Sequence, residues 1–484
     1  MAIKFTGSYY FFVDQFAIAA LPSKSFTLEG DWALGSNWSD GVVPTANDDV
    51  VVYAPATINS GTVAYANQIT YGANGSITIK DGGQLKHATS GLQVVVEKNI
   101  TPWTVENGEP DGYYFISKPL STAIASDEYS TKVPGMLDNN KYDYYLFNAN
   151  GNDGLEWRNY RAGNFGMSAF NGYLYANQED VTLKFTGAAY MSGNNAAYNF
   201  TYNYTYDATS ELSFNGWTLI GNPYTANCYL SYNGESYDFY VMNTAGDGYE
   251  ATSRALKPCE GAFFHYESDG TLTWSPVEPE TSSSPMLEMT VSQNRGKVDN
   301  ARVRFGNAKQ LPKLSFREGS TKLYIPQGGK DYAVVRSEGE GELPVNFKAE
   351  KNGTYTLNFD TENVEFNHLH LIDNLTGADI DLLATPSYTF QSRTSDYASR
   401  FRLVFSTTGV EENGTEANAN FAYFNGSEWV VDASDNATLE VIDMTGRTVA
   451  HGTRSVGTNG MAQGVYVLRL VDNNSVKTQK IVVR

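Results

Sequence analysis

The chain has 484 residues, with 54 acidic and 34 basic side chains and a formal charge of −20 at pH 7. This surplus of negative charge repels phosphate backbones, so nucleic acid is excluded as an expected partner. No run of about 18 apolar residues occurs, so no membrane-spanning helix is expected. A chain of this length is expected to divide into several domains of roughly 80 to 200 residues.

The composition predicts an all-β protein. The chain has 33 tyrosines, 44 glycines and only 18% charged residues, which suits many short strands joined by glycine turns. Apolar and polar residues alternate in most segments, whereas helical spacing does not persist. In chain order we expect a short β-solenoid or sandwich, a duplicated β-module, a β-sandwich and a small C-terminal domain.

Residues 1–29 are interpreted as a strand remnant or as a defective signal segment. Lys4 precedes an apolar stretch, as in a secretory signal peptide, but Asp14 and Gln15 interrupt that stretch. We therefore expect the start of the chain to be truncated or misplaced, with residues 3–21 as a strand remnant of an upstream module.

Residues 30–100 contain short apolar runs separated by glycines. Such regular spacing indicates the rungs of a β-solenoid or, as the alternative, a small sandwich, and we favour rungs. Trp32 and Trp38 stand near the start of this segment. Their rings are expected to cap a core, although tryptophans can also stack on sugars.

Residues 101–276 repeat themselves. Residues 114–120 correspond to 218–224, residues 142–145 to 237–240, and residues 171–175 to 260–264. The order of the matches is the same in both halves, which predicts a duplicated, aromatic-rich β-module.

Two polar segments separate the later modules. Residues 277–285 are rich in Pro, Glu and Ser and predict a linker. Residues 286–406 hold seven short strand-like runs, a number and spacing typical of a two-sheet β-sandwich. Residues 407–420 lack large apolar side chains and predict a second, exposed linker.

Residues 421–484 predict a folded end. Leu439 and Val441, then Val465 and Val467, alternate as half-buried strands do, and the β-pattern continues to the last residue. Because a chain normally frays at its terminus, a strand pattern that continues to the end indicates that the terminus is structured and used.

This segment resembles the C-terminal sorting domain, type A, of the bacterial type IX secretion system. The likeness lies in a strand at 441–443, a turn at 445–447, a strand start at 464–466 and the closing run 480–484. The resemblance implies an immunoglobulin-like fold whose final strands the translocon recognises. The sorting-signal residues it implies are Gly446, Arg447, Gly464, Val465, Tyr466, Lys480, Ile481, Val482, Val483 and Arg484.

The resemblance further implies how such a protein is processed. A surface sortase removes the domain and often attaches a lipopolysaccharide anchor in its place. The cut is expected within residues 406–420, and the mature protein is expected to be secreted or attached to the outer membrane at the cell surface.

Cys228 and Cys259 are the two cysteines of the chain. An even number in an exported protein permits one disulfide, and buried free thiols are the alternative. No histidines stand near them at zinc-site spacing, so no metal site is expected.

Other chemical candidates favour structural explanations. His368 and His370 share a strand face, but no clear third metal ligand accompanies them. Asp379 and Asp381 could form a carboxylate pair, yet they lie in a turn-rich region where carboxylates satisfy backbone amides. The segments 148–154 and 243–248 look like oxygen-rich turns that could bind a divalent cation weakly. No catalytic or cofactor motif appears, so a non-enzymatic protein without a cofactor is expected.

Exposed aromatic residues could form a glycan-binding face. The candidates are Tyr144, Trp157, Tyr240 and Tyr249. The alternative is that the many tyrosines simply follow from the strand content.

Two functions remain open from the sequence. The first is an exported structural or adhesive surface protein, whose partners would be the translocon, the sortase, a lipopolysaccharide anchor, and host or bacterial glycans or proteins. The second is an extracellular polysaccharide-active enzyme or glycan-binding component, with its catalytic part in the solenoid or upstream.

Overall fold

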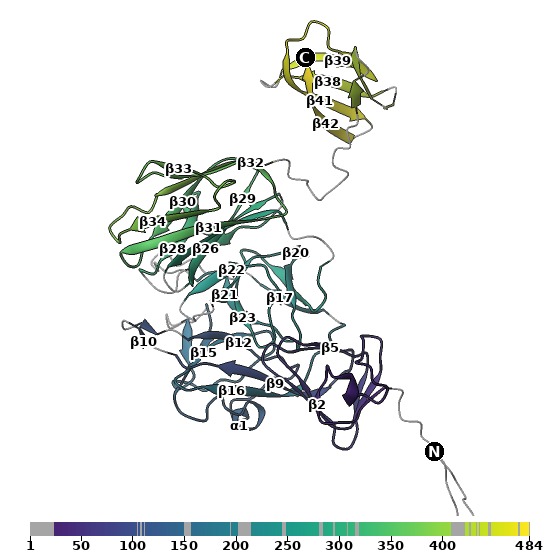
Figure 1. The fold of residues 1–484 in the computed structure, drawn as a ribbon, viewed down its shortest axis with the longest axis vertical. Coiled ribbons are helices and arrows are strands. Elements are labelled where there is room, and N and C mark those ends of the chain that lie inside the picture. The colour runs from purple at the N-terminus through teal and green to yellow at the C-terminus, as the bar shows by residue number, and fades with distance from the viewer. Residues whose placement is uncertain are drawn as a thin grey trace, which may run out of the picture. The chain divides into compact units, whose positions relative to one another are not determined.

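The structure is a computed structural model of the whole chain, and it is almost entirely β (Figure 1). The residues that it describes are 24–103, 105–106, 109–110, 112–149, 156–193, 195–201, 214–243, 248–279, 284–293, 296–306, 308–314, 319–407, 422–424, 427–431, 433–434, 436–443, 447–472 and 475–483. The chain forms two compact units, residues 1–408 and 409–484, which are considered separately. The predicted all-β fold class is confirmed. None of the helices in the described ranges has the length and apolar character that crossing a membrane requires.

The first unit begins with parallel strands stacked in rungs. Pro55 pairs with Ser76 in one stack, and Val63 pairs with Gln84 in another, so each rung lies directly on the one before. The structure therefore has the solenoid form, which the sequence favoured over a sandwich. The strands are β1 (Ser25–Phe26), β2 (Gly30–Asp31), β3 (Val50–Val52), β4 (Pro55–Ile58), β5 (Val63–Tyr65), β6 (Ile69–Tyr71), β7 (Ser76–Ile79), β8 (Gln84–Lys86) and β9 (Gln93–Ile100).

Aromatic side chains close the first end of the solenoid. Trp32 and Phe26 are fully buried and Trp38 is 3% exposed. The two indole rings meet edge to face at 4.8 Å, and the Trp38 Nε1–H donates to the Trp32 carbonyl at 2.9 Å. The short helix η1 (Gly35–Asn37) joins them. These tryptophans therefore cap the core, as expected. Because their rings are buried, no sugar can stack on them.

The solenoid continues into the duplicated module through one long antiparallel pair. Strand β16 (Val181–Ala188) pairs with the last rung, β9, along its whole length. A two-stranded ribbon of β10 (Val105–Glu106) and β11 (Glu109–Pro110) lies between them in the chain, and α1 (Tyr129–Lys132) follows. The solenoid and the duplicated module therefore share a sheet.

The repeated phrases occupy equivalent strands in two four-stranded sheets. The first has the order β12, β15, β13, β14 and the second has the order β18, β23, β21, β22. The register is also equivalent, since Ser117 pairs with Gly172 and Gly221 pairs with Gly261. The strands are β12 (Tyr114–Ser117), β13 (Tyr142–Phe147), β14 (Trp157–Asn159), β15 (Gly172–Asn177), β18 (Trp217–Gly221), β21 (Phe239–Met242), β22 (Tyr249–Thr252) and β23 (Gly261–His265).

The second half carries a further sheet in the order β17, β24, β19, β20. Trp274 and Phe264 are buried in the cluster that this sheet shares with β23. The strands are β17 (Ala196–Phe200), β19 (Tyr229–Tyr232), β20 (Glu235–Ser236) and β24 (Gly270–Ser275).

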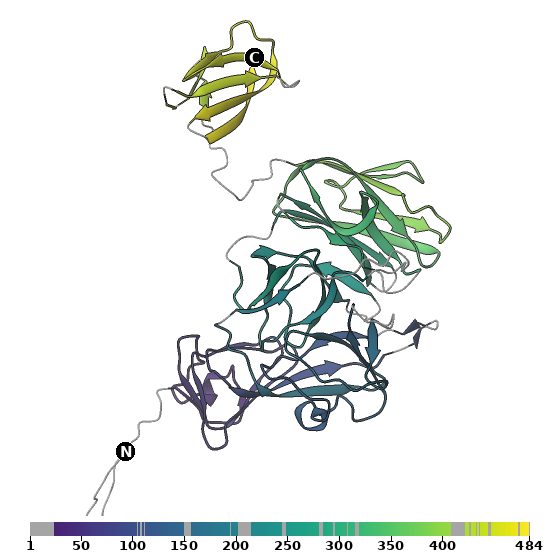
Figure 2. The same cartoon turned by 180° about the vertical axis from the view of Figure 1, so that it is seen from behind.

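The predicted sandwich is one sheet of eleven strands that folds over itself (Figures 1 and 2). Ten of these strands form a continuous hydrogen-bonded path, and β27 pairs with β29 beside it. Phe305 and Phe405, from strands well separated in that path, meet edge to face at 5.8 Å in its core. The strands are β25 (Met286–Gln293), β26 (Gly296–Phe305), β27 (Leu311–Pro312), β28 (Lys322–Gln327), β29 (Lys330–Ser337), β30 (Glu340–Lys348), β31 (Gly353–Glu362), β32 (Phe366–Asp373), β33 (Ala378–Asp381), β34 (Ser387–Ser392) and β35 (Phe401–Thr407).

The second unit is a small antiparallel sandwich. One sheet has the order β36, β37, β40 and the other has the order β39, β38, β41, β42. Leu439, Val441 and Leu468 are fully buried between them. The strands are β36 (Ala422–Phe424), β37 (Glu428–Val431), β38 (Thr438–Ile442), β39 (Thr448–Gly452), β40 (Ser455–Gly457), β41 (Gly464–Asp472) and β42 (Ser475–Val483).

Candidate functional site

The last strand of the second unit is paired on one side only among the described residues. All nine positions of β42 pair with β41, from Asp472 with Ser475 to Gly464 with Val483. Strand β42 stands at the end of its sheet order. The final strand of the chain is therefore a sheet edge, whose outward backbone groups are available to a partner.

Side chains of these two strands alternate between core and surface. Tyr466 and Ile481 are buried, and the Tyr466 hydroxyl donates to the Ala462 carbonyl at 2.8 Å. Val465 and Val482 pair directly across the strands on the opposite face, where they are 37% and 54% exposed. The predicted signal residues thus comprise both core positions and an exposed apolar pair.

The hairpin between β38 and β39 is closed by Asp443 and Arg447. The Arg447 backbone N–H donates to Asp443 Oδ1 at 3.0 Å, and the Asp443 N–H donates to the Arg447 carbonyl at 2.9 Å. The Arg447 side chain is 78% exposed, although its Nε lies 3.2 Å from Asp443 Oδ2. Gly446, Arg484 and the side chain of Lys480 lie outside the described residues.

Polar side chains tie the two sheets of this unit together. The Gln479 amide accepts from the Ala422 N–H at 2.9 Å and donates to the Ala422 carbonyl at 3.0 Å, which fastens β42 to β36. Ser434 donates to Asp472 through both its hydroxyl and its N–H, and these bonds hold the pKa of the Asp472 carboxyl below its usual value. The last strand is thus held by β41 in its own sheet and by β36 of the other sheet.

Comparison with known families identifies this unit. Residues 426–484 match the family model of a secretion system C-terminal sorting domain. The chain carries a type IX secretion sorting domain. The match covers the strands β37 to β42, so the resemblance seen in the sequence is confirmed, and the sorting domain directs the protein to export.

Comparisons of the whole chain add little to this result. No curated protein matches. One solved structure, a biofilm associated protein BSP domain, has 10% sequence identity and a TM-score of 0.12, with 80% of this chain and 66% of that chain covered. The chain thus spans about two thirds of that protein's length. With a TM-score this low, neither fold nor function is inferred from this likeness.

The aromatic residues expected to bind glycans are mainly core residues. Tyr144 is fully buried and Tyr240 is 1% exposed, so neither ring can present a face to a sugar. Trp157 and Tyr249 are half-buried against the same cluster as Tyr240. For Tyr144 and Tyr240 the glycan interpretation is wrong. The alternation in the sequence did not decide whether these strand residues are buried or exposed, and tertiary packing buries them.

The two cysteines are buried free thiols and form no disulfide in the structure. Cys228 lies in the hydrophobic cluster of the second half-module, whereas Cys259 lies in the cluster that extends from the solenoid. Burial raises the pKa of both thiols, which keeps them protonated and unreactive. The disulfide that the sequence permitted does not form in the structure, and the alternative, two buried free thiols, is what the structure has.

The histidine and aspartate candidates make local contacts. The His368 and His370 rings stack at 4.2 Å, and His370 Nδ1 lies 2.7 Å from Asp379 Oδ1. Asp381 accepts from the Leu383 N–H at 2.9 Å, as a turn carboxylate does. Within the described ranges, no group of three or more His, Cys, Asp or Glu residues could hold a metal ion.

Four further predicted segments fall partly outside the described residues. The N-terminal segment lies outside up to residue 23, and the expected cleavage segment lies outside from residue 408. Of the two oxygen-rich turns, residues 150–154 and 244–247 are likewise not described.

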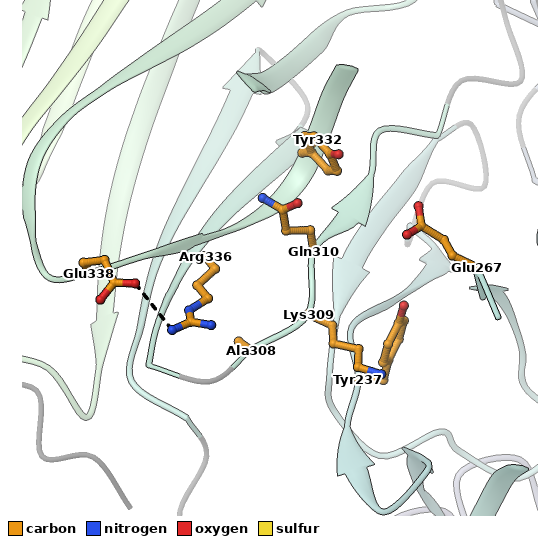
Figure 3. A pocket seen from close by; sticks show the side chains of 8 residues that line it. All are labelled: Tyr237, Glu267, Ala308, Lys309, Gln310, Tyr332, Arg336 and Glu338. Carbon is orange, nitrogen blue, oxygen red and sulfur yellow. Dashed lines mark hydrogen bonds and ion pairs between the residues drawn. The ribbon is translucent and has the colours of Figure 1, made fainter. Parts of the chain in front are cut away.

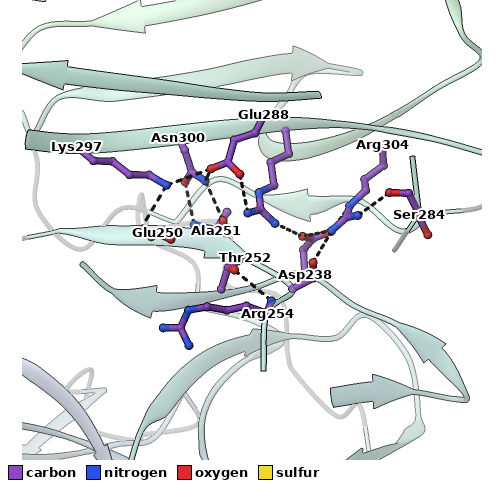
Figure 4. A network of polar contacts seen from close by, with 12 residues as sticks. Asp238, Glu250, Ala251, Thr252, Arg254, Ser284, Glu288, Lys297, Asn300 and Arg304 are labelled. Carbon is purple, nitrogen blue, oxygen red and sulfur yellow. Dashed lines mark hydrogen bonds and ion pairs between the residues drawn. The ribbon is translucent and has the colours of Figure 1, made fainter. Parts of the chain in front are cut away.

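A buried ionic junction was missed by the sequence interpretation. Asp238, from the second half-module, accepts from Arg302 at 3.1 Å and from Arg304 at 2.9 and 3.0 Å (Figure 4). All three side chains are at most 7% exposed. Burial opposes ionisation of Asp238, but the neighbouring arginines outweigh it and hold the pKa of its carboxyl below its usual value.

Further bonds extend this junction between β22 and β26. The Asn300 side chain accepts from the Ala251 N–H at 2.9 Å and donates to the Ala251 carbonyl at 2.8 Å. Glu288 accepts from Arg302 at 2.8 Å and pairs with Lys297 at 3.1 Å. Arg302 and Arg304 alternate on one strand, which in the sequence could have indicated a pair of cationic side chains on one face. The sequence did not reveal their shared partner, Asp238, because it lies more than sixty positions away.

Proposed function

We propose that this chain is an exported cell-surface protein with a structural or adhesive role and without catalytic activity. The observation that carries the proposal is the sorting domain at residues 426–484. The described residues of the first unit form one compact body, which would then be the cargo that the sorting domain delivers.

The architecture of the first unit supports a structural role. Its solenoid and its duplicated module share a sheet through β9 and β16, and the duplicated module and the sandwich share the Asp238 junction. Modules joined by a common sheet and by buried ion pairs hold a defined spacing, as a stalk or an adhesin requires.

The finer steps of export are part of the proposal. We expect the translocon to bind the sorting domain through its final strands, β41 and β42. We also expect a sortase to cleave within residues 406–420 and a lipopolysaccharide anchor to replace the domain. The exposed Val465 and Val482 and the free edge of β42 support recognition at this end of the fold.

Deletion of residues 426–484 tests the delivery step. The full-length chain and the deletion variant would be expressed behind the same secretory signal in a bacterium that has a type IX system. The full-length protein should reach the surface, and the variant should remain in the periplasm. An isogenic strain without the translocon provides the matched control, because it should retain both forms.

Two results would contradict the proposal. Surface display of the deletion variant, with circular dichroism confirming that it is folded, would show that the sorting domain does not deliver the cargo. Release of reducing ends from complex polysaccharides by the purified protein would favour the enzymatic alternative.

A further inference from the structure

A pocket of about 510 Å³ lies where the duplicated module meets the sandwich (Figure 3). Tyr237 and Glu267 line it from the second half-module. Lys309, Gln310, Tyr332 and Arg336 line it from the sandwich. Pockets of this volume, formed where two modules meet, are common ligand sites.

The two walls of the pocket are held in place by the buried junction. Tyr237 immediately precedes Asp238, whose carboxylate is bound by two arginines of the sandwich. On the other wall, Gln310 precedes β27, and the Tyr240 hydroxyl donates to the Pro312 carbonyl of that strand at 3.2 Å. Because both walls are tied within a few residues of the pocket, a ligand would find its contacts already arranged.

Tyr237 of one wall and Lys309 of the other wall lie close together in the pocket. The Tyr237 side chain is 7% exposed, and the Lys309 ammonium lies 5.9 Å from the centre of its ring. Lys309 Nζ is also 3.6 Å from a Glu235 carboxylate oxygen. Burial and the negative charge of Glu267 raise the pKa of the Tyr237 hydroxyl, which therefore remains protonated and able to donate a hydrogen bond.

The charges around the pocket balance. Lys309 and Arg336 are cationic, and Glu267 and Glu338 are anionic. The Arg336 guanidinium lies 3.4 Å from Glu338, whose side chain is 86% exposed, so this pair is weak and can exchange for a ligand. A phosphate or a carboxylate would meet two like charges, and an apolar ligand would meet charged and amide groups that it cannot satisfy.

The pocket instead offers what a neutral, hydroxyl-rich ligand needs. Glutamate and glutamine oxygens accept hydrogen bonds, whereas arginine, lysine and the glutamine amide donate them, so hydroxyls of either orientation find partners. The half-buried ring of Tyr332, on the same strand as Arg336, adds an aromatic side chain to these polar groups.

We propose that this pocket binds the end of a neutral oligosaccharide. The assignment names a ligand class for the proposed adhesive function and rests on that function. It places the glycan contact at residues other than the aromatic ones that the sequence suggested.

Binding can be measured with the purified full-length chain by saturation-transfer NMR. The probes are neutral trisaccharides of glucose, mannose, xylose and N-acetylglucosamine, with sialyllactose as an acidic comparison. We expect signals from at least one neutral trisaccharide and weaker signals from sialyllactose. Arg336→Ala and Glu267→Gln should each weaken binding at least about fivefold. The first variant removes a guanidinium donor, and the second replaces an accepting carboxylate oxygen with a donating amide NH2.

Arg393→Ala is the matched control, because Arg393 is exposed on the same sandwich and does not line the pocket. It should bind as the unmodified chain does. The proposal is overturned if no neutral trisaccharide gives a signal, if sialyllactose binds more tightly, or if both pocket variants bind as well as the control. Adhesion of the protein to cells that both pocket variants retain would reject the pocket and leave the adhesive function standing. Absence of adhesion by the unmodified chain would reject the adhesive function itself.

Discussion

Phe170 and Cys259 occupy equivalent positions in the two halves of the duplicated module. Each has a positive φ, 68° for Phe170 and 61° for Cys259. The Phe170 carbonyl accepts from the Gly221 N–H at 2.7 Å, and the Cys259 carbonyl accepts from the equivalent Ser117 N–H at 3.0 Å. Each half thus gives the other the same backbone bond, and the module is built like a two-fold symmetric dimer within one chain.

This close contact predicts that glycines at the junction of the halves cannot be enlarged. A Cβ on Gly172 would lie 2.4 Å from the Ile220 carbonyl oxygen, and one on Gly221 would lie 2.5 Å from the Asn171 carbonyl oxygen. Gly172→Ala and Gly221→Ala should each lower the free energy of unfolding by about 1–3 kcal/mol, because backbone has to move. Urea denaturation measures the change.

Gly163→Ala is the control for these variants. It lies in the same module, has no positive φ and has no atom within 4 Å of the added Cβ. It should be neutral or slightly stabilising. Equal stability of all three variants would show that the halves do not meet as described.

The Asp238 junction predicts that removing a charge from a buried ion pair destabilises the protein more than removing one from an exposed pair. Asp238→Asn removes the charge that Arg302 and Arg304 share in the interior, so we expect a loss of about 3–5 kcal/mol in the free energy of unfolding. Glu342→Gln removes an exposed partner of Arg402 and should cost at most about 1 kcal/mol.

Denaturant unfolding of both variants, followed by intrinsic fluorescence, makes this comparison. A second transition in Asp238→Asn would further indicate that the duplicated module and the sandwich unfold together only while the junction is intact. Comparable, small losses in the two variants would contradict a structural role for the junction.

Two buried histidines predict a loss of stability in acid. Burial lowers the pKa of both His87 and His265 from 6.5 to about 4. Between these values the unfolded chain binds protons that the folded chain does not, so the free energy of unfolding falls as the pH drops. The effect is up to ~3 kcal/mol per histidine.

The double variant His87→Gln/His265→Gln should lose less stability than the unmodified chain between about pH 7 and pH 4.5. The readout is the pH dependence of the urea midpoint, so that any fixed cost of the substitutions cancels. An unchanged slope in the double variant would exclude the buried histidines as its cause.

The free thiols predict that stability does not depend on redox conditions. Cys228 and Cys259 are fully buried and 1% exposed, in different hydrophobic clusters. A reducing agent should leave the melting temperature unchanged, and a thiol reagent should label both cysteines only after unfolding. A drop in the melting temperature on reduction would show that the expected disulfide forms after all.

Local patterns in the sequence were sufficient to predict the strands, the duplicated module and the sorting domain of this protein. Alternation with a period of two marked the strands, the repeated phrases marked the duplicated module, and the dense strands up to residue 484 marked the sorting domain. These properties were predictable because a strand, a turn or a repeat is specified by residues that are close together in the chain.

Only the tertiary structure decided which side chains are exposed and which charged groups form ion pairs. Alternation shows that Tyr144 and Tyr240 lie in strands, but a second layer of the fold determines that both are buried. In the same way, Asp238 acquires its two arginines, and Cys228 is kept apart from Cys259, through contacts between segments distant in sequence. Burial and ion pairing depend on packing in three dimensions. A local sequence pattern therefore does not predict which distant residue a side chain will contact.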